Sequence, residues 1–74
     1  MSKAPSLSGR RLLRALLRAG FVEMRVAGSH HLIRHPDGRA TTVPVHGSRD
    51  LPIGTLHRIL RDVRMKIEEL AALL

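Results

Sequence analysis

The chain of 74 residues contains no cysteine, and Phe21 is its one aromatic residue apart from the histidines. Without cysteine, neither a disulfide nor a thiolate metal site can stabilise the fold, so an apolar core must do so. A chain this short buries only about 60% of the surface that its unfolded form exposes, which predicts one small domain of marginal stability spanning residues 1–74. The scarcity of aromatics argues against the base-stacking surfaces of single-strand binders.

Acidic side chains and long apolar runs are also scarce. The chain has 6 Asp and Glu against 13 Lys and Arg, a formal net charge of +7. Most of the basic residues are arginines, whose planar guanidinium suits phosphate oxygens, so we expect RNA, DNA or an acidic protein as partner. No apolar run approaches the roughly 20 residues of a membrane-spanning helix, and Met1–Ser8 lacks the apolar segment of a signal peptide. We therefore expect a cytoplasmic protein without membrane contact.

Apolar residues at helical spacing predict a helix over residues 8–19, after a loose polar lead-in over residues 1–7. Ser8 or Ser6 is placed to cap its start, and Gly20 to cap its end. Beyond that glycine, residues 21–26 alternate between apolar and charged side chains, which is typical of a half-buried strand.

Two further strands and two helices complete the expected order. Residues 30–34 and 40–45 read as strands on either side of a His-Pro-Asp-Gly-Arg turn, and Pro44 places the third strand at an edge or near its end. Pro52 suits the first turn of a second helix, capped by Asp50 or Thr55. The tail from residue 65 is helical in composition. The pattern predicts an α+β domain of order α-β-β-β-α, with a three-stranded antiparallel sheet, helices on one face and a short C-terminal helix.

Three of the five histidines, His30, His31 and His35, lie within six residues, directly after Gly28 and Ser29. Neighbouring residues of a strand point to opposite faces, and alternation alone does not decide which of these imidazoles is exposed. The ordinary interpretation of a single histidine is a solvated or hydrogen-bonded structural residue. The functional interpretation is acid–base catalysis, because imidazole titrates near neutral pH and can give or take a proton.

Acid–base catalysis by histidine would suit the cleavage of RNA. RNA carries its own nucleophile, the 2′-hydroxyl, so a protein need only move protons and stabilise charge on phosphate, and it needs no metal or other cofactor. Metal binding is disfavoured, since His31 and His35 would lie about 13 Å apart along a strand. Arg10, Arg14 and Arg18, spaced four apart on one helix face, are candidates for phosphate contact.

Three segments together resemble the HicA toxins of bacterial toxin–antitoxin pairs. They are GRRLLRALLRAGF, GSHHLIRHPDGRATTVPVH and LPIGTLHRILRD, and they occur in the order and spacing of that family. The resemblance extends from about Ser8 to Leu70. It implies a fold similar to the double-stranded-RNA-binding domain and the activity of a small ribonuclease that cleaves messenger RNA.

The resemblance also implies roles for individual residues and partners. The catalytic histidine of the family falls on His30, and Gly28 and Ser29 match the residues before it. A further family histidine falls on His46, to which we assign a secondary role. The expected partners are mRNA and a HicB-like antitoxin that covers the active site, which makes a toxin–antitoxin hetero-oligomer the expected assembly.

Some questions stay open at this level. We expect Arg34 and Arg39 to contact RNA together with the helix arginines Arg10 and Arg14, and the second acid–base group could be His31, His35 or His46. Arg64 stands where the family often has a glycine, so the second helix is expected to run on or to bend less sharply into the tail. The alternatives to a ribonuclease are a non-catalytic double-stranded-RNA-binding module, which leaves the histidine cluster unexplained, and a basic adaptor for an acidic protein.

Overall fold

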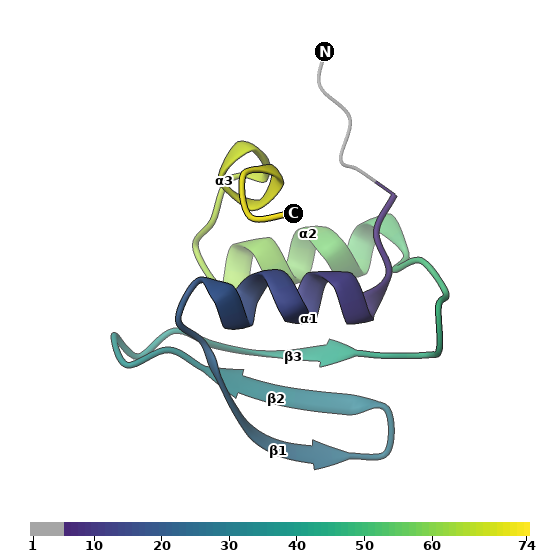
Figure 1. Cartoon of the computed structure of the whole chain (residues 1–74), viewed down its shortest axis with the longest axis horizontal. Helices are drawn as coiled ribbons and strands as arrows, with labels where there is room; N and C mark the ends of the chain where they lie inside the picture. Colours follow the sequence, from purple (N-terminus) through teal and green to yellow (C-terminus); the bar gives the residue numbers. More distant parts are fainter. Residues whose placement is uncertain (1–5) are drawn as a thin grey trace.

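The computed structural model describes residues 6–74 and has the element order helix, three strands, two helices (Figure 1). The elements are α1 (Gly9–Arg18), β1 (Val22–Ala27), β2 (His30–Arg34), β3 (Ala40–Pro44), α2 (Ile53–Asp62) and α3 (Ile67–Ala71). The strands form one antiparallel sheet in the order β1-β2-β3. This arrangement confirms the predicted α+β class, including Pro44 at the end of an edge strand. Of the lead-in expected over residues 1–7, residues 1–5 lie outside those described.

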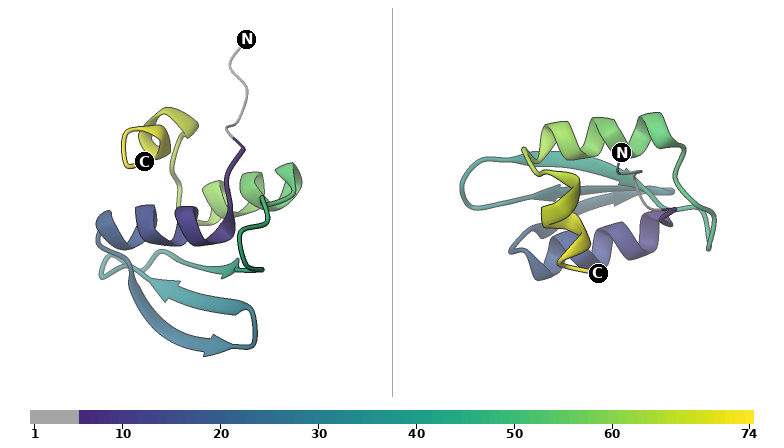
Figure 2. Two further views of the ribbon diagram at one scale, coloured as in Figure 1. Left: turned by 45° about the vertical axis from the view of Figure 1, so that its right-hand side comes forward. Right: turned by 90° about the horizontal axis from the view of Figure 1, so that it is seen from above.

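Both long helices lie on one face of the sheet, and α3 lies beyond them, on the side away from the strands (Figures 1 and 2). The helices contact β3 more than the other strands, so β1 is the strand farthest from them. None of the helices in the described part of the chain is long and apolar enough to span a bilayer.

The core lies between the helices and the helix-facing side of the sheet. The apolar face predicted for the first helix is confirmed, since Leu12 and Leu16 of α1 are fully buried, and Ile59 of α2 is fully buried too. The sheet contributes Ile33 and Val43, which are buried as well. Leu7, which the sequence places in the lead-in, is 1% exposed and accepts a backbone hydrogen bond from Leu51 at 2.7 Å.

The start of α1 is fixed by a cap and by a close backbone contact. Ser8 is the N-cap, and its hydroxyl accepts a hydrogen bond from the Arg11 amide at 3.2 Å, as predicted. Gly9 follows, and a Cβ added there would lie 1.9 Å from the carbonyl oxygen of Pro44. Only glycine permits this approach, so the first turn of α1 packs directly on the end of β3.

The expectation of a half-buried first strand is wrong. Every residue of β1 is exposed, with Val22 at 53%, Met24 at 57% and Val26 at 51%. The alternating pattern correctly predicts a strand here, but the helices pack over β3 and leave β1 uncovered. The register also shifts between Glu23 and Arg25, so Met24 occupies a β-bulge.

Both expectations for the ends of α2 are wrong. Its N-cap is Pro52, and no side chain caps it, so neither Asp50 nor Thr55 has that role. At the other end the helix stops at Asp62 and does not run on. Arg64 adopts φ 52°, the left-handed conformation that glycine usually provides after a helix. The chain therefore turns into the tail at Arg64 despite the missing glycine.

The tail is helical over α3 only. Leu70 is fully buried and Ile67 partly so, but Leu74 is 40% exposed, so the buried face of the tail ends before the last residue. The Arg18 guanidinium donates two hydrogen bonds to the carbonyl oxygen of Leu73, at 3.1 and 2.8 Å. This contact holds the C-terminal segment against the end of α1.

Candidate active site

His30 is the first residue of β2, and its side chain points to the open face of the sheet. Ile33 is buried toward the helices, so alternation places His31 on the helix-facing side and His30, Leu32 and Arg34 on the other. The His30 side chain is exposed. Unlike the rings of His31 and His35, its imidazole makes no hydrogen bond to another described residue. An imidazole free in this way is available to a substrate.

The turn before His30 is tied to the end of β3. Gly28 adopts φ 59° in this turn, and a side chain added there would meet open space. The carbonyl oxygen of Ser29 accepts a hydrogen bond from the amide of Val45 at 2.8 Å, and His30 pairs with Pro44 across the two strands. The Gly-Ser-His segment and the chain leading to His46 therefore share one end of the sheet.

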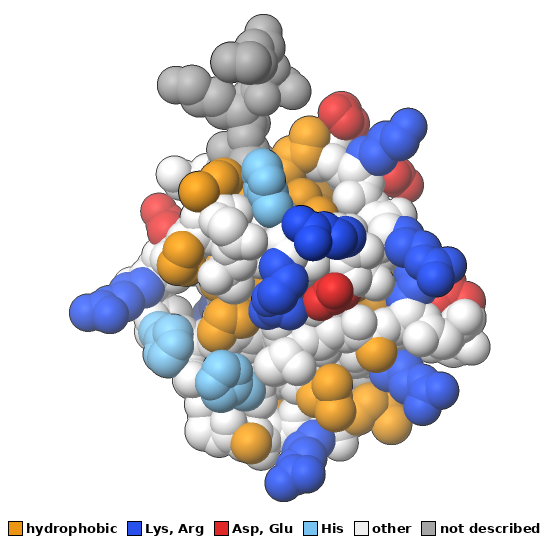
Figure 3. All heavy atoms as spheres, turned by 180° about the vertical axis from the view of Figure 1, so that it is seen from behind, with side chains coloured by type: hydrophobic (Ala, Val, Ile, Leu, Met, Phe, Trp, Pro, Cys, Tyr) orange, Lys and Arg blue, Asp and Glu red, His pale blue; other side chains and the backbone are white. Residues whose placement is uncertain are grey.

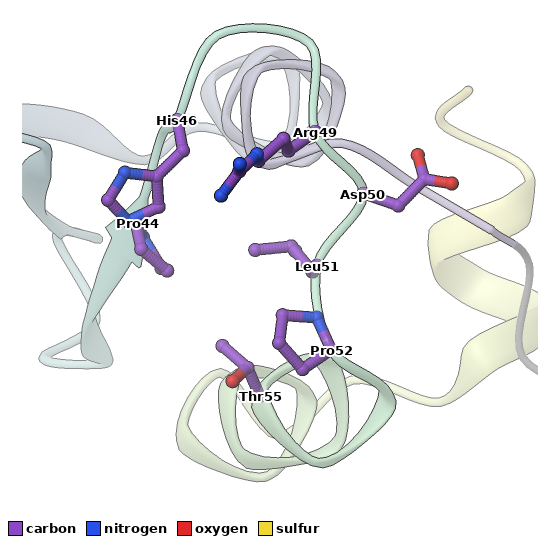
Figure 4. A pocket seen from close by; sticks show the side chains of 7 residues that line it. All are labelled: Pro44, His46, Arg49, Asp50, Leu51, Pro52 and Thr55. Atoms are coloured by element: carbon purple, nitrogen blue, oxygen red, sulfur yellow. The ribbon is translucent and has the colours of Figure 1, made fainter.

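A pocket of about 280 Å³ opens at the same end, between the tip of β3, the following loop and the start of α2 (Figure 4). It is lined by Pro44, His46, Arg49, Asp50, Leu51, Pro52 and Thr55. In Figure 4 the Arg49 guanidinium reaches toward the side of the pocket that holds His46, and the Asp50 carboxylate points away from it. The left side of Figure 3, which shows this end of the sheet from behind, carries histidine side chains on the surface.

Arg49 is a residue of this pocket that sequence reasoning missed. It stands in a loop with no regular spacing relative to His30. The signal that could have pointed to it is the tight turn, in which the Arg49 amide donates to the carbonyl oxygen of His46 at 3.0 Å and Gly47 adopts φ 58°. This turn brings Arg49 back toward His46, so the pocket is lined by both an imidazole and a guanidinium group.

His31 lies on the helix-facing side, where its Nδ1 contacts the Glu23 carboxylate of the neighbouring strand. Its side chain is 21% exposed. The sequence placed Glu23 only as a polar strand residue and did not predict this pair. Since the sheet separates the two rings, His31 and His30 do not face a common site.

His35 and Arg39 belong to the opposite end of the sheet, where they build the corner after β2. His35 packs edge-on against Phe21 with ring centroids 5.1 Å apart, and its Nδ1 accepts a hydrogen bond from the Asp37 amide at 3.1 Å. The Arg39 guanidinium lies over the Phe21 ring and donates to the carbonyl oxygen of Val63 at 2.7 Å. Both side chains hold the turn against the core.

Asp37 completes this corner. Its carboxylate accepts hydrogen bonds from the amide of Arg39 at 3.0 Å and from the guanidinium of the same residue at 2.8 Å. The backbone bond is the main cause that lowers the pKa of Asp37 below its ordinary value, and the guanidinium acts in the same direction. Because Arg39 already has three partners here, it has little freedom to reach an RNA phosphate.

The other predicted phosphate contacts are exposed but lie on separate faces. Arg34 lies on the open face, at the far end of β2 from His30. Arg10 is the second residue of α1 and follows Gly9, which packs on the end of β3, so it lies at the His30 end of the sheet. Arg14 lies one turn further on and lines a shallow recess with Arg11 and Arg18.

Figure 3 shows further Lys and Arg side chains on the α2 side of the molecule, around a carboxylate. There the Arg58 guanidinium pairs with the Asp62 carboxylate at 2.9 Å and donates to the carbonyl oxygen of Thr42 at 3.0 Å. In the part of the chain that the structure describes, no group of three or more His, Asp or Glu side chains could hold a metal ion.

This geometry agrees with what the chain is similar to. The family model for the HicA toxin of bacterial toxin-antitoxin systems matches residues 9–65, from the start of α1 to the turn after α2. The chain belongs to the HicA toxin family. No curated protein sequence matches it. As a HicA toxin, the protein is the toxin component of a toxin–antitoxin system and pairs with an antitoxin.

The family match covers most of the fold. The matched residues contain α1, the complete sheet and α2, and they include both His30 and the pocket beside His46. The tail helix α3 lies outside the match, and in this chain it follows the left-handed Arg64.

Proposed function

We propose that this HicA toxin is a metal-independent endoribonuclease that cleaves mRNA by histidine acid–base catalysis and is inhibited by a HicB-type antitoxin. The observation that carries the proposal is the His30 imidazole, which is exposed and has no hydrogen-bond partner among the described residues. It lies at the end of the sheet where its cross-strand partner Pro44 lines a pocket with a second histidine and an arginine. In this account His30 takes or gives a proton at the scissile phosphodiester, and the 2′-hydroxyl of the RNA is the nucleophile.

The geometry favours His46 as the second acid–base group. His31 lies on the other face of the sheet and is paired with Glu23, and His35 is five residues further along, about 16 Å at the rise of a strand. His46 follows Pro44, the cross-strand partner of His30, by two residues. Cleavage needs one group to remove a proton and one to supply it, and His30 with His46 is the pair that one end of the sheet provides.

Arg49 and Arg10 both lie at this end of the sheet, and we assign them to the phosphate. A guanidinium there stabilises the charge that develops on phosphate oxygens during the reaction. Gly28 and Ser29 leave room for the RNA backbone, since nothing lies within 4 Å of the position of a side chain at Gly28. Arg34, Arg14 and Arg39 are outer contacts in this account, with Arg39 the least free of the three.

Replacement of single histidines tests the proposal. His30→Ala is expected to slow cleavage of an end-labelled mRNA by about a hundredfold or more, the usual contribution of a general acid or base, with little change in RNA affinity. His46→Ala is expected to slow it by about tenfold or more. His57→Ala, which removes an exposed histidine of α2, is the matched control and should cleave at the parental rate.

The outcomes separate the proposal from its alternative. If His30→Ala cuts at the parental rate, the assignment of His30 is wrong. If the parent itself binds RNA, with an affinity that falls with added salt, and never cuts it, the protein is a non-catalytic RNA-binding module of the double-stranded kind.

A further inference from the structure

The free edge of β1 and the recess beside it form a surface that no contact within the described chain covers. Of the described residues, only those of β2 pair with the backbone of β1, and the strand has no proline. The other edge of the sheet is closed, because the guanidinium of Arg58 occupies the carbonyl oxygen of Thr42 and Pro44 has no amide proton to offer. β1 therefore presents unpaired backbone donors and acceptors to a partner strand.

The surface is apolar with a basic rim. A shallow recess of about 300 Å³ is lined by Val22, Met24, Arg34, His35 and Pro36, and the two aliphatic side chains of β1 there are more than half exposed. Leu32, 39% exposed, continues the apolar surface on the open face. The lower part of Figure 3, where the β1–β2 hairpin lies, shows this mixture of hydrophobic and basic side chains.

The charge of this surface indicates which kind of partner strand would bind to it. Arg25 and Arg34 lie on the open face, and neither forms an ion pair with another described residue. The one carboxylate of β1, on Glu23, is engaged by His31 on the other face. A second copy of this chain, also at +7, would bring like charges together. RNA would satisfy the arginines but would leave the aliphatic side chains without a partner. The aromatic ring that lines the recess, the His35 imidazole, is already packed against Phe21 and is a poor surface for bases to stack on.

We infer that an extended, acidic segment of the antitoxin adds as a strand to the edge of β1, with an apolar side chain in the Val22–Met24–Pro36 recess and carboxylates on Arg25 and Arg34. The inference rests on the antitoxin pairing of the family and not on the ribonuclease activity proposed above. Strand addition supplies affinity through main-chain hydrogen bonds and specificity through side-chain pockets. The bulge at Met24 limits uninterrupted pairing to residues 25–27, so the recess supplies the second anchor.

The toxin–antitoxin complex, obtained by co-expression, provides the test. Arg25 and Ala27 bond to β2 on either side of Val26, so the amide of Val26 is the one that points to the free edge. Hydrogen exchange of free and complexed toxin is compared at this amide, which is expected to exchange about tenfold or more slowly in the complex. Arg25→Glu should weaken antitoxin binding by about tenfold or more, because like charges then face each other. Arg61→Glu, the same change at an exposed position of α2, is the control and should alter binding less than about twofold.

Met24→Lys tests the recess independently and is expected to weaken binding to a similar extent as Arg25→Glu. Circular dichroism and a thermal scan establish that each variant is folded. Unchanged exchange of the Val26 amide in the complex would overturn the inference, as would equal antitoxin affinity of the Arg25 and Arg61 variants. A loss of RNA binding by Arg25→Glu with antitoxin affinity retained would identify the surface as an RNA contact and would equally overturn it. None of these readouts requires the toxin to cut RNA.

Discussion

Gly9→Ala provides a sharp test of how α1 is seated on the sheet. The added Cβ would lie 1.9 Å from the carbonyl oxygen of Pro44, where an ordinary contact is 3.4 Å or more. The added Cβ is fixed to the helix backbone and the carbonyl oxygen belongs to the strand backbone, so no side-chain rotation can relieve the clash. The helix and the strand must therefore separate by about 1.5 Å. Overpacking of this kind destabilises a protein by about 1–3 kcal/mol, and the better helix propensity of alanine offsets part of that loss.

We therefore expect the free energy of unfolding to fall by about 1–2 kcal/mol, which lowers Tm by roughly 5–15 °C in a domain of this size. Thermal and urea unfolding followed by circular dichroism measure both quantities. Gly54→Ala is the matched control, because Gly54 also lies in the first turn of a helix but a Cβ there meets nothing within 4 Å. That variant should gain about 0.5–1 kcal/mol. A Gly9→Ala protein as stable as the parent would refute the close packing of α1 on β3.

Two further substitutions test single features of the fold. Arg64→Gly should raise the free energy of unfolding by about 1 kcal/mol, seen as a higher urea midpoint, because it relieves the left-handed conformation at φ 52°; an unchanged or lower midpoint would contradict this. Asp37 has a pKa lowered in the folded state, so its contribution to stability is present above its ordinary pKa and is lost as the pH falls below about 4. Asp37→Asn should therefore have a lower Tm than the parent at neutral pH, with a difference that narrows toward pH 2.5 in thermal scans, and a difference independent of pH would contradict the assignment.

The helices and the order of the strands were predictable because their signals are local. Leucines at helical spacing define the buried face of α1, and Ser8 and Gly20 mark its ends, whatever the rest of the chain does. The exposure of β1 was not predictable, because it depends on how far α1 and α2 reach across the sheet. Alternation of side chains indicates a strand but does not say whether anything covers it.

The candidate site was predictable in part. The resemblance identified His30, but only the burial of Ile33 decides that His30 faces the open side while His31 faces the helices. The grouping with His46 and Arg49 depends on contacts between distant segments, among them the hydrogen bonds from Val45 to Ser29 and from Leu51 to Leu7. Such pairings carry no periodic signal in the sequence.

The proposed ribonuclease activity depends on His30 and on the 2′-hydroxyl of the RNA, and it needs no metal ion. The most direct measurement is cleavage of an end-labelled mRNA in excess EDTA by the parent protein and by His30→Ala, beside the same RNA with 2′-deoxy nucleotides at the sites of cutting. We expect that only the parent protein cuts, and that it cuts only the unmodified RNA. Cutting that requires an added divalent metal, or that persists in His30→Ala or on the 2′-deoxy substrate, would contradict this expectation.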